Sequence, residues 1–142
     1  MTGLSPKRTV VPIDFSDLSH QALDKAIEIA GKEGEVLVIH VLTELSTMEP
    51  GNLYGTVTDE DRIKSAQEFL RKKLADDKYA RVSFHAVVGD AGREITSCAE
   101  RESADLIVIP SHGYGFVKHL LLGSVAERVV RLAHCPVLVL RS

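Results

Sequence analysis

The sequence contains few of the residues on which several classes of protein depend. It has no Trp, only 2 Cys and 2 Met, and aromatic residues make up 5% of its 142 residues. The formal net charge is −3, so the aromatic platforms and the positive charge used in generic nucleic-acid binding are both scarce. Two isolated cysteines are typical of a reducing cytoplasm rather than of a secreted disulfide scaffold. We therefore expect a cytoplasmic protein that does not bind nucleic acid.

Long apolar runs are missing as well. The longest stretch without Asp, Glu, Lys or Arg covers 106–117 and is interrupted by Pro110, so it falls short of the ~20 apolar residues of a membrane span. Residues 1–8 contain no apolar signal core. Apolar residues at 44% and charged residues at 26% are ordinary globular values, and the length predicts a single domain over residues 1–142.

Hydrophobic periodicity predicts a regular alternation of strands and helices. Short β-branched or almost uninterrupted apolar runs indicate strands, and apolar residues at three- and four-residue spacing indicate the helices between them. Four helices are predicted, the last from Ser124 to about His134, where Ser124 and Glu127 match an S-x-x-E capping box. Strands alternating with helices pair in parallel through right-handed crossovers, so we expect a doubly wound, Rossmann-like five-stranded α/β sheet. The predicted strands cover 8–13, 36–42, 82–88, 105–110 and 136–140.

One stretch breaks this alternation. Residues 43–57 show no periodicity and contain Pro50 and two glycines, which is typical of a long loop. Because the loop follows the second strand at the ligand end of such a sheet, we expect it to form a mobile cover or a partner surface.

Polar and glycine-containing segments follow the first and the fourth predicted strands. Ligands of a doubly wound sheet bind beyond the carboxyl ends of the strands, where the strand order reverses, so we expect a crevice between residues 12–14 and 111–124. Gly113 and Gly123 allow close approach of the backbone, and the free amides that follow Gly123 would cradle a phosphate. Asp14 can accept hydrogen bonds from ribose hydroxyls, and a cap for the first helix is its alternative role.

Other site chemistries fit the sequence less well. A P-loop G-x-x-x-x-G-K-[ST] is absent, and no G-x-S-x-G elbow accompanies Ser111 and His112, whose side chains should point apart as sequence neighbours. The histidines and cysteines lack metal-ligand spacing, and a phosphoacceptor receiver domain would need a lysine where Arg141 stands. We expect His40 to be a satisfied residue of a buried strand and Cys98 to be a core residue.

Several segments resemble the universal stress protein family, and together they cover almost the whole chain. The ATP-binding branch of that family has a motif similar to G-x2-G-x9-G-[ST]; here Gly113 and Gly123 stand at its second and third glycines, and Ser124 follows. Pro110 replaces the first glycine, and a proline has no N–H to offer a ligand. The segments that carry the resemblance are 12–16, 36–41, 105–113, 121–129 and 135–140.

The resemblance implies a fold similar to the adenine nucleotide alpha-hydrolase-like proteins and a site for ATP, with Mg²⁺ or Mn²⁺ entering through the phosphate oxygens. It implies that Asp14 contacts the ribose and that the backbone around Val41 pairs with the adenine edge. The other implied nucleotide-binding residues are Pro12, Ile13 and Val88 or Gly89 around the base, Gly113, Gly123, Ser124 and Val125 at the phosphates, and Pro110, Ser111 and His112 beside them.

The function implied by the resemblance is a stress-response signalling or regulatory module. No residue is obviously poised as a base for an attacking water, so we expect nucleotide binding, with hydrolysis slow at most. The apolar residues Val137, Leu138, Val139 and Leu140 form a terminal strand, which commonly lies at a sheet edge and can pair with a second copy. Family members commonly dimerise through this strand, so the resemblance implies a homodimer. The alternative is a homodimer that binds no nucleotide and acts through contacts with an unknown protein partner.

Overall fold

The computed structural model describes residues 5–44, 57–113 and 121–141. Its strands are β1 (Arg8–Pro12), β2 (Glu35–Leu42), β3 (Val82–Val88), β4 (Leu106–Pro110) and β5 (Val137–Leu140). Its helices are α1 (Asp17–Ala30), α3 (Asp59–Lys73), α4 (Ala91–Arg101) and α5 (Ser124–Leu132), with a short 3-10 helix η1 (Asp77–Tyr79). The loop expected over 43–57 falls almost entirely on residues 45–56, outside the described part of the chain.

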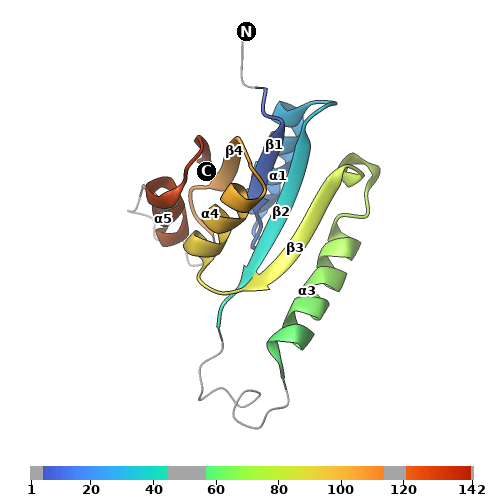
Figure 1. Cartoon of the computed structure of the whole chain (residues 1–142). Helices are drawn as coiled ribbons and strands as arrows, with labels where there is room; N and C mark the ends of the chain where they lie inside the picture. Colours follow the sequence, from blue (N-terminus) through green and yellow to red (C-terminus); the bar gives the residue numbers. More distant parts are fainter. Residues whose placement is uncertain (1–4, 45–56, 114–120, 142) are drawn as a thin grey trace.

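The strands form one parallel sheet in the order β3-β2-β1-β4-β5, which confirms the predicted doubly wound α/β class. Helices α1 and α3 cover one face, and α4 and α5 cover the other (Figure 1). β1 lies in the middle, with β2 and β3 added on one side and β4 and β5 on the other. Within residues 5–44, 57–113 and 121–141, the helices include none with the length and apolar run that a bilayer crossing requires.

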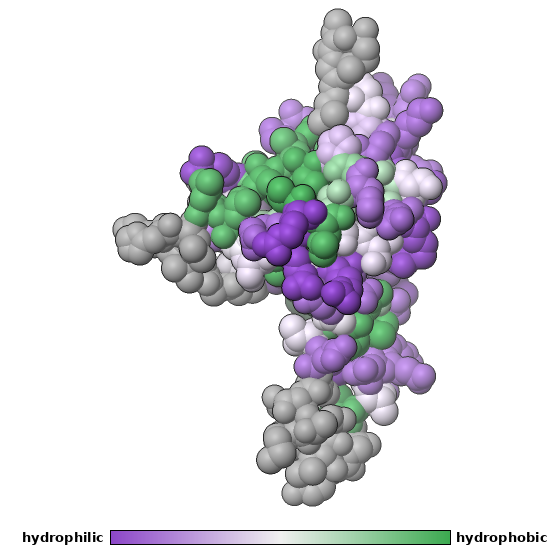
Figure 2. All heavy atoms as spheres, turned by 60° about the vertical axis from the view of Figure 1, so that its left-hand side comes forward, coloured by the Kyte–Doolittle hydropathy of each residue, from purple (hydrophilic) through white to green (hydrophobic). Residues whose placement is uncertain are grey.

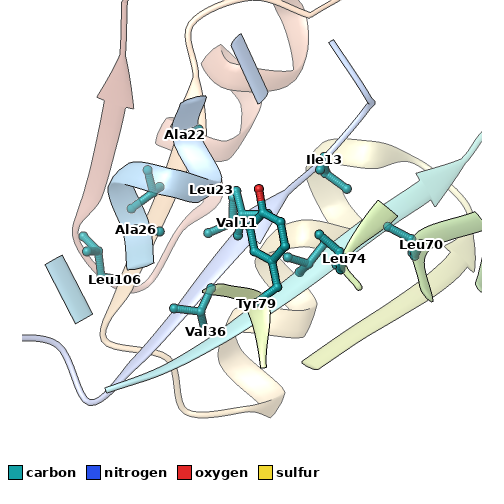
Figure 3. Packing of buried hydrophobic residues seen from close by; sticks show 12 residues of the cluster. Val11, Ile13, Ala22, Leu23, Ala26, Val36, Leu70, Leu74, Tyr79 and Leu106 are labelled. Carbon is teal, nitrogen blue, oxygen red and sulfur yellow. The ribbon is translucent and has the colours of Figure 1, made fainter. Parts of the chain in front are cut away.

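Two apolar clusters, one on each face of the sheet, hold these layers together. Val10 and Val11 are neighbours on β1, and because strand side chains alternate, they belong to opposite clusters. Figure 3 shows the cluster beneath α1, to which Leu23, Val11 and Tyr79 belong. In the other cluster Cys98 is fully buried, as predicted, and burial raises the pKa of its thiol.

Polar side chains mark the beginnings of α1, α3 and α4. Ser16 accepts a hydrogen bond from the Ser19 N–H (3.2 Å) at the start of α1. Thr58 forms a capping box with Asp61 at α3, and Asp90 caps α4. These side chains satisfy backbone N–H groups that have no partner within the helix.

Helix α5 begins differently. Its N-cap is Gly123, which has no side chain with which to cap the helix. The predicted capping box of Ser124 and Glu127 is therefore wrong, because Ser124 is already the first helical residue. Glu127 instead pairs with Arg131, one turn further along the helix.

Asp105 connects the start of β4 to the chain that leads into β1. Its carboxylate accepts hydrogen bonds from the backbone N–H groups of Lys7 (2.9 Å) and Arg8 (3.0 Å). Slight burial acts to raise the pKa of Asp105, but these hydrogen bonds together outweigh it, so the pKa lies below the ordinary value of 3.8.

We expect Asp105→Asn to lower the free energy of unfolding at neutral pH by about 0.5 kcal/mol, a small effect because solvent screens this exposed carboxylate. A carboxyl group whose pKa is lowered by folding stabilises the protein above its unfolded pKa, and this contribution disappears as the pH falls through the folded value. Urea unfolding of both proteins should therefore show a difference at neutral pH that vanishes well below pH 3.8. A difference that stays constant in acid would contradict this role of the carboxylate.

Candidate functional site

A crevice opens at the carboxyl ends of β1 and β4. These strands are neighbours although β2 and β3 come between them in the sequence, and the strand order reverses at this point. Doubly wound sheets bind ligands at such reversals, and a cavity of about 290 Å³ lies here. The position agrees with the crevice expected between residues 12–14 and 111–124. The lining residues are Pro12, Ile13, Asp14, Ile39, Val41, Ala91, Ile95, Ile109, Pro110, Ser111, His112, Gly113, Gly123, Ser124, Val125 and Ala126.

Eleven of the thirteen residues implied for a nucleotide site line this crevice, and Val88 and Gly89 do not. Gly89 follows β3, on the far side of β2, where its N–H donates to the Leu42 carbonyl (2.9 Å). Sequence reasoning missed the apolar wall formed by Ile39, Ala91, Ile95, Ile109 and Ala126. Strand alternation could have placed Ile39 on the same face as Val41. Only the packing of α4 brings its own apolar residues over that face.

Asp14 stands in a tight turn between β1 and α1. Its Oδ1 accepts hydrogen bonds from the Ser16 N–H (3.0 Å) and from the Ser16 hydroxyl (2.5 Å). The alternative role considered for Asp14, capping the first helix, belongs to Ser16, which is the N-cap of α1. These two hydrogen bonds fix the Asp14 carboxylate in the lining of the crevice.

Gly113 passes the Asp14 carboxylate at very short range. A Cβ atom at position 113 would lie 2.1 Å from Asp14 Oδ2, far inside van der Waals contact. The backbone of Gly113 is not in the left-handed region, so conformational freedom does not explain the glycine. The missing side chain is what allows the loop after β4 to close against Asp14.

The N-terminus of α5 forms another part of the lining. The N–H groups of Ser124, Val125 and Ala126 have no partner within the helix, and among the described residues no side chain caps them. Gly123 holds this end in place, because its N–H donates to the Ser111 carbonyl (2.7 Å). All three open donors belong to residues that line the crevice, so the positive end of the helix dipole is available to an anion there.

Ser111 and His112 are both buried, with exposed fractions of 2% and 9%. Ser111 Oγ lies 3.1 Å from His112 Nδ1, within hydrogen-bonding distance. The prediction that these neighbours point apart is therefore wrong, because β4 ends at Pro110 and the alternation of strand side chains ends with it. The pair adds polar side-chain atoms to a crevice whose other donors are backbone amides.

Backbone groups dominate the polar chemistry of the crevice. Among its described lining residues, Asp14 is the only carboxylate, His112 is the only imidazole, and none is Lys or Arg. A phosphate would therefore rest mainly on the N–H groups of α5. Gly115, Lys118 and His119, which stand between the two motif glycines Gly113 and Gly123 in the sequence, lie outside the described residues. In the part of the chain that the structure describes, no three or more His, Cys, Asp or Glu side chains are grouped so that they could hold a metal ion.

His40 of β2 is satisfied, as the sequence predicted. Its Nδ1 donates a hydrogen bond to the carbonyl of Ile13 (2.7 Å), an oxygen that can only accept. His40 lines a separate groove beside the crevice, whereas Ile13 lines the crevice itself. This hydrogen bond therefore connects the walls of two hollows.

Comparison with known protein sequences gives long matches. The model of the universal stress protein family matches residues 6–141 of this chain. Universal stress protein MJ0531 of Methanocaldococcus jannaschii is 37% identical over 139 residues, which cover 95% of this chain and 82% of that protein. Universal stress protein MJ0577 of the same organism is 31% identical, over 95% of this chain and 94% of that protein.

Solved structures show the same arrangement of strands and helices. The structure of MJ0577 superposes with a TM-score of 0.76 at 33% identity and covers 96% of both chains. A universal stress protein solved in complex with cAMP superposes with a TM-score of 0.65 at 25% identity, over 96% of this chain and 97% of that one. In both comparisons the similarity spans nearly the whole chain.

Proposed function

We propose that this chain, which belongs to the universal stress protein family, binds an adenine nucleotide in the crevice between β1 and β4. One observation carries the proposal: the Asp14 carboxylate and the open N–H groups of α5 line a single cavity where the strand order reverses. A carboxylate suits ribose hydroxyls, a helix N-terminus suits phosphates, and a nucleotide carries both groups. The family member solved in complex with cAMP supports an adenine ligand.

The end of β2 favours adenine over guanine. The Leu42 carbonyl accepts from Gly89 on the β3 side, so by strand alternation the Val41 carbonyl points to the other side, beyond the end of β1. An acceptor at that place suits the amino group of adenine and repels the carbonyl that guanine carries at the same ring position. Ile39 and Ile95 provide apolar walls for the ring.

We propose ATP as the preferred nucleotide. Pro110 offers no N–H, so the phosphates would rest on the segment from Gly123 to Ala126. The described residues form no metal cluster of their own, so Mg²⁺ or Mn²⁺ would bind through phosphate oxygens. A divalent cation held in this way neutralises phosphate charge in a crevice whose described lining contains no Lys or Arg.

ATP at about 100 times its dissociation constant, supplied with Mg²⁺, is expected to raise the free energy of unfolding by about 2.7 kcal/mol. For a domain of this size the melting temperature should rise by roughly 5 to 10 °C. The same concentration of GTP should give a smaller rise. Differential scanning fluorimetry measures these shifts, and equilibrium dialysis measures the affinities. An unchanged melting temperature together with no dialysis signal would favour the alternative in which the protein binds no nucleotide.

We further propose that the protein acts in the cytoplasm as a homodimeric signalling or regulatory module. β5 is an edge strand, and all four of its residues are half-buried. Figure 2 shows apolar side chains gathered on the face that comes forward from the α5 side. On α5 itself, Val130 is 47% exposed and Leu132 is 37% exposed. A second copy paired with β5 would satisfy the open edge of the sheet. Cys98 and Cys135 are both free, in keeping with a reducing compartment.

A further inference from the structure

A second hollow, which we call the α3 groove, lies between the N-terminal half of α3 and the end of β2. Its volume is about 540 Å³, which falls in the range of small-molecule sites. Its described lining shares no residue with that of the nucleotide crevice. The lining residues are Phe15, His40, Leu42, Val57, Asp61, Arg62, Ser65, Ala66 and Phe69.

Three rings form one wall of the α3 groove. The ring of Phe15 lies 4.8 Å from that of His40 and 4.7 Å from that of Phe69, centroid to centroid. Phe69 is 46% exposed and Val57 is 39% exposed, so apolar surface remains open in the groove. Phe15 has a φ of +68°, a left-handed conformation that a bulky residue rarely adopts. This strained turn places the Asp14 side chain in the nucleotide crevice and the Phe15 side chain in the α3 groove.

Arg62 brings a positive charge into this apolar setting. Only 16% of its side chain is exposed, and its one partner among the described residues is the exposed Asp59, with 3.5 Å between Nη1 and Oδ1. A guanidinium has five N–H donors, so a single long contact leaves most of them open. Asp61, the only carboxylate in the described lining, forms the capping box of α3 with Thr58. A largely covered arginine side chain whose guanidinium has open donors is suited to bidentate binding of a carboxylate.

We propose that the α3 groove binds a small carboxylate with an apolar tail, with the carboxylate on Arg62 and the tail against Phe15 and Phe69. Such a ligand complements both the charge and the open apolar surface of the groove. The positive charge of Arg62 would repel a cationic ligand. The carboxylate that could bind such a ligand, Asp61, already takes part in the capping box of α3. The site is distinct from the nucleotide crevice, because the two described linings share no residue.

Decanoate is a suitable probe, because it joins one carboxylate to a flexible apolar chain. We expect isothermal titration calorimetry to show saturable binding of decanoate to the full chain. Arg62→Met keeps an apolar side chain but removes the charge, so it should weaken this binding at least about tenfold. Arg71→Met is the matched control: Arg71 is exposed on the same helix, outside the groove, and its loss should leave the affinity unchanged.

Phe69→Ala tests the tail separately from the charge. Because Phe69 is half exposed, the fold should tolerate its loss, and the affinity for decanoate should fall. Decanol lacks the charge, so it should bind the wild type and Arg62→Met equally. Equal weakening of decanoate binding by Arg62→Met and Arg71→Met would overturn the proposal, as would the absence of saturable binding. Displacement of decanoate by ATP would also overturn it, because it would assign the probe to the nucleotide crevice.

Discussion

Replacing Gly113 by alanine is expected to weaken ATP binding by about 10-fold to 100-fold. The new Cβ atom would lie 2.1 Å from Asp14 Oδ2, so the carboxylate must move away from the position that Ser16 fixes. Hydrogen bonds to a charged group contribute about 1.5 to 3 kcal/mol, and losing those from the ribose to Asp14 accounts for a change of this size. Isothermal titration calorimetry with ATP measures the loss.

A double variant separates this mechanism from a direct clash with the phosphates. In the Asp14→Ala background there is no carboxylate to displace, so adding Gly113→Ala should then change the affinity very little. A dideoxy analogue of ATP, which lacks the ribose hydroxyls, is the ligand control and should bind the wild type and Gly113→Ala almost equally. Equal losses in both backgrounds would show that Gly113 serves the phosphates directly. Melting curves without ligand check that each variant is folded.

Val139→Pro is expected to raise the dissociation constant of the proposed homodimer by about 100-fold while each monomer keeps its sheet. Ser111 donates to the Leu140 carbonyl (2.8 Å), so Leu140 and alternate residues of β5 face β4. The N–H groups of Val137 and Val139 therefore point to the open edge. Proline at 139 removes an edge donor from each copy without removing a donor to β4, and sheet edges tolerate proline.

Val139→Ala is the matched control for this experiment. It keeps the N–H but shortens a side chain that packs against the apolar cluster beneath α4 and α5, so it reports the loss of packing alone. A charged residue at 139 would be less informative, because it would also disturb that cluster within the monomer. Analytical ultracentrifugation of the three proteins at micromolar concentration measures the assembly. A monomeric wild type, or a Val139→Pro protein that remains dimeric, contradicts pairing through β5.

The succession of strands and helices followed from the sequence because it depends on local periodicity. The apolar run 36–42 predicted a strand covered on both faces, and Val36–Ile39 of β2 are buried inside the sheet. A glycine at position 31 favours the end of a helix there, and Gly31 is the C-cap of α1 with a φ of +65°. Motif spacing also singled out Gly113 and Gly123, which both line the crevice.

Only the tertiary structure decided how these parts meet. The position of β1 between β2 and β4 depends on packing summed over both faces of the sheet, and no local pattern encodes it. That order brings Gly113 against Asp14, so the missing side chain of this motif glycine leaves room for the Asp14 carboxylate. The sequence predicted a capping box at the start of α5 and side chains of Ser111 and His112 that point apart. Both predictions were wrong, for a related reason. The residue at which a helix starts and the direction of each side chain both change when the backbone shifts by one position. Tertiary packing around the crevice sets this position, and local propensity does not.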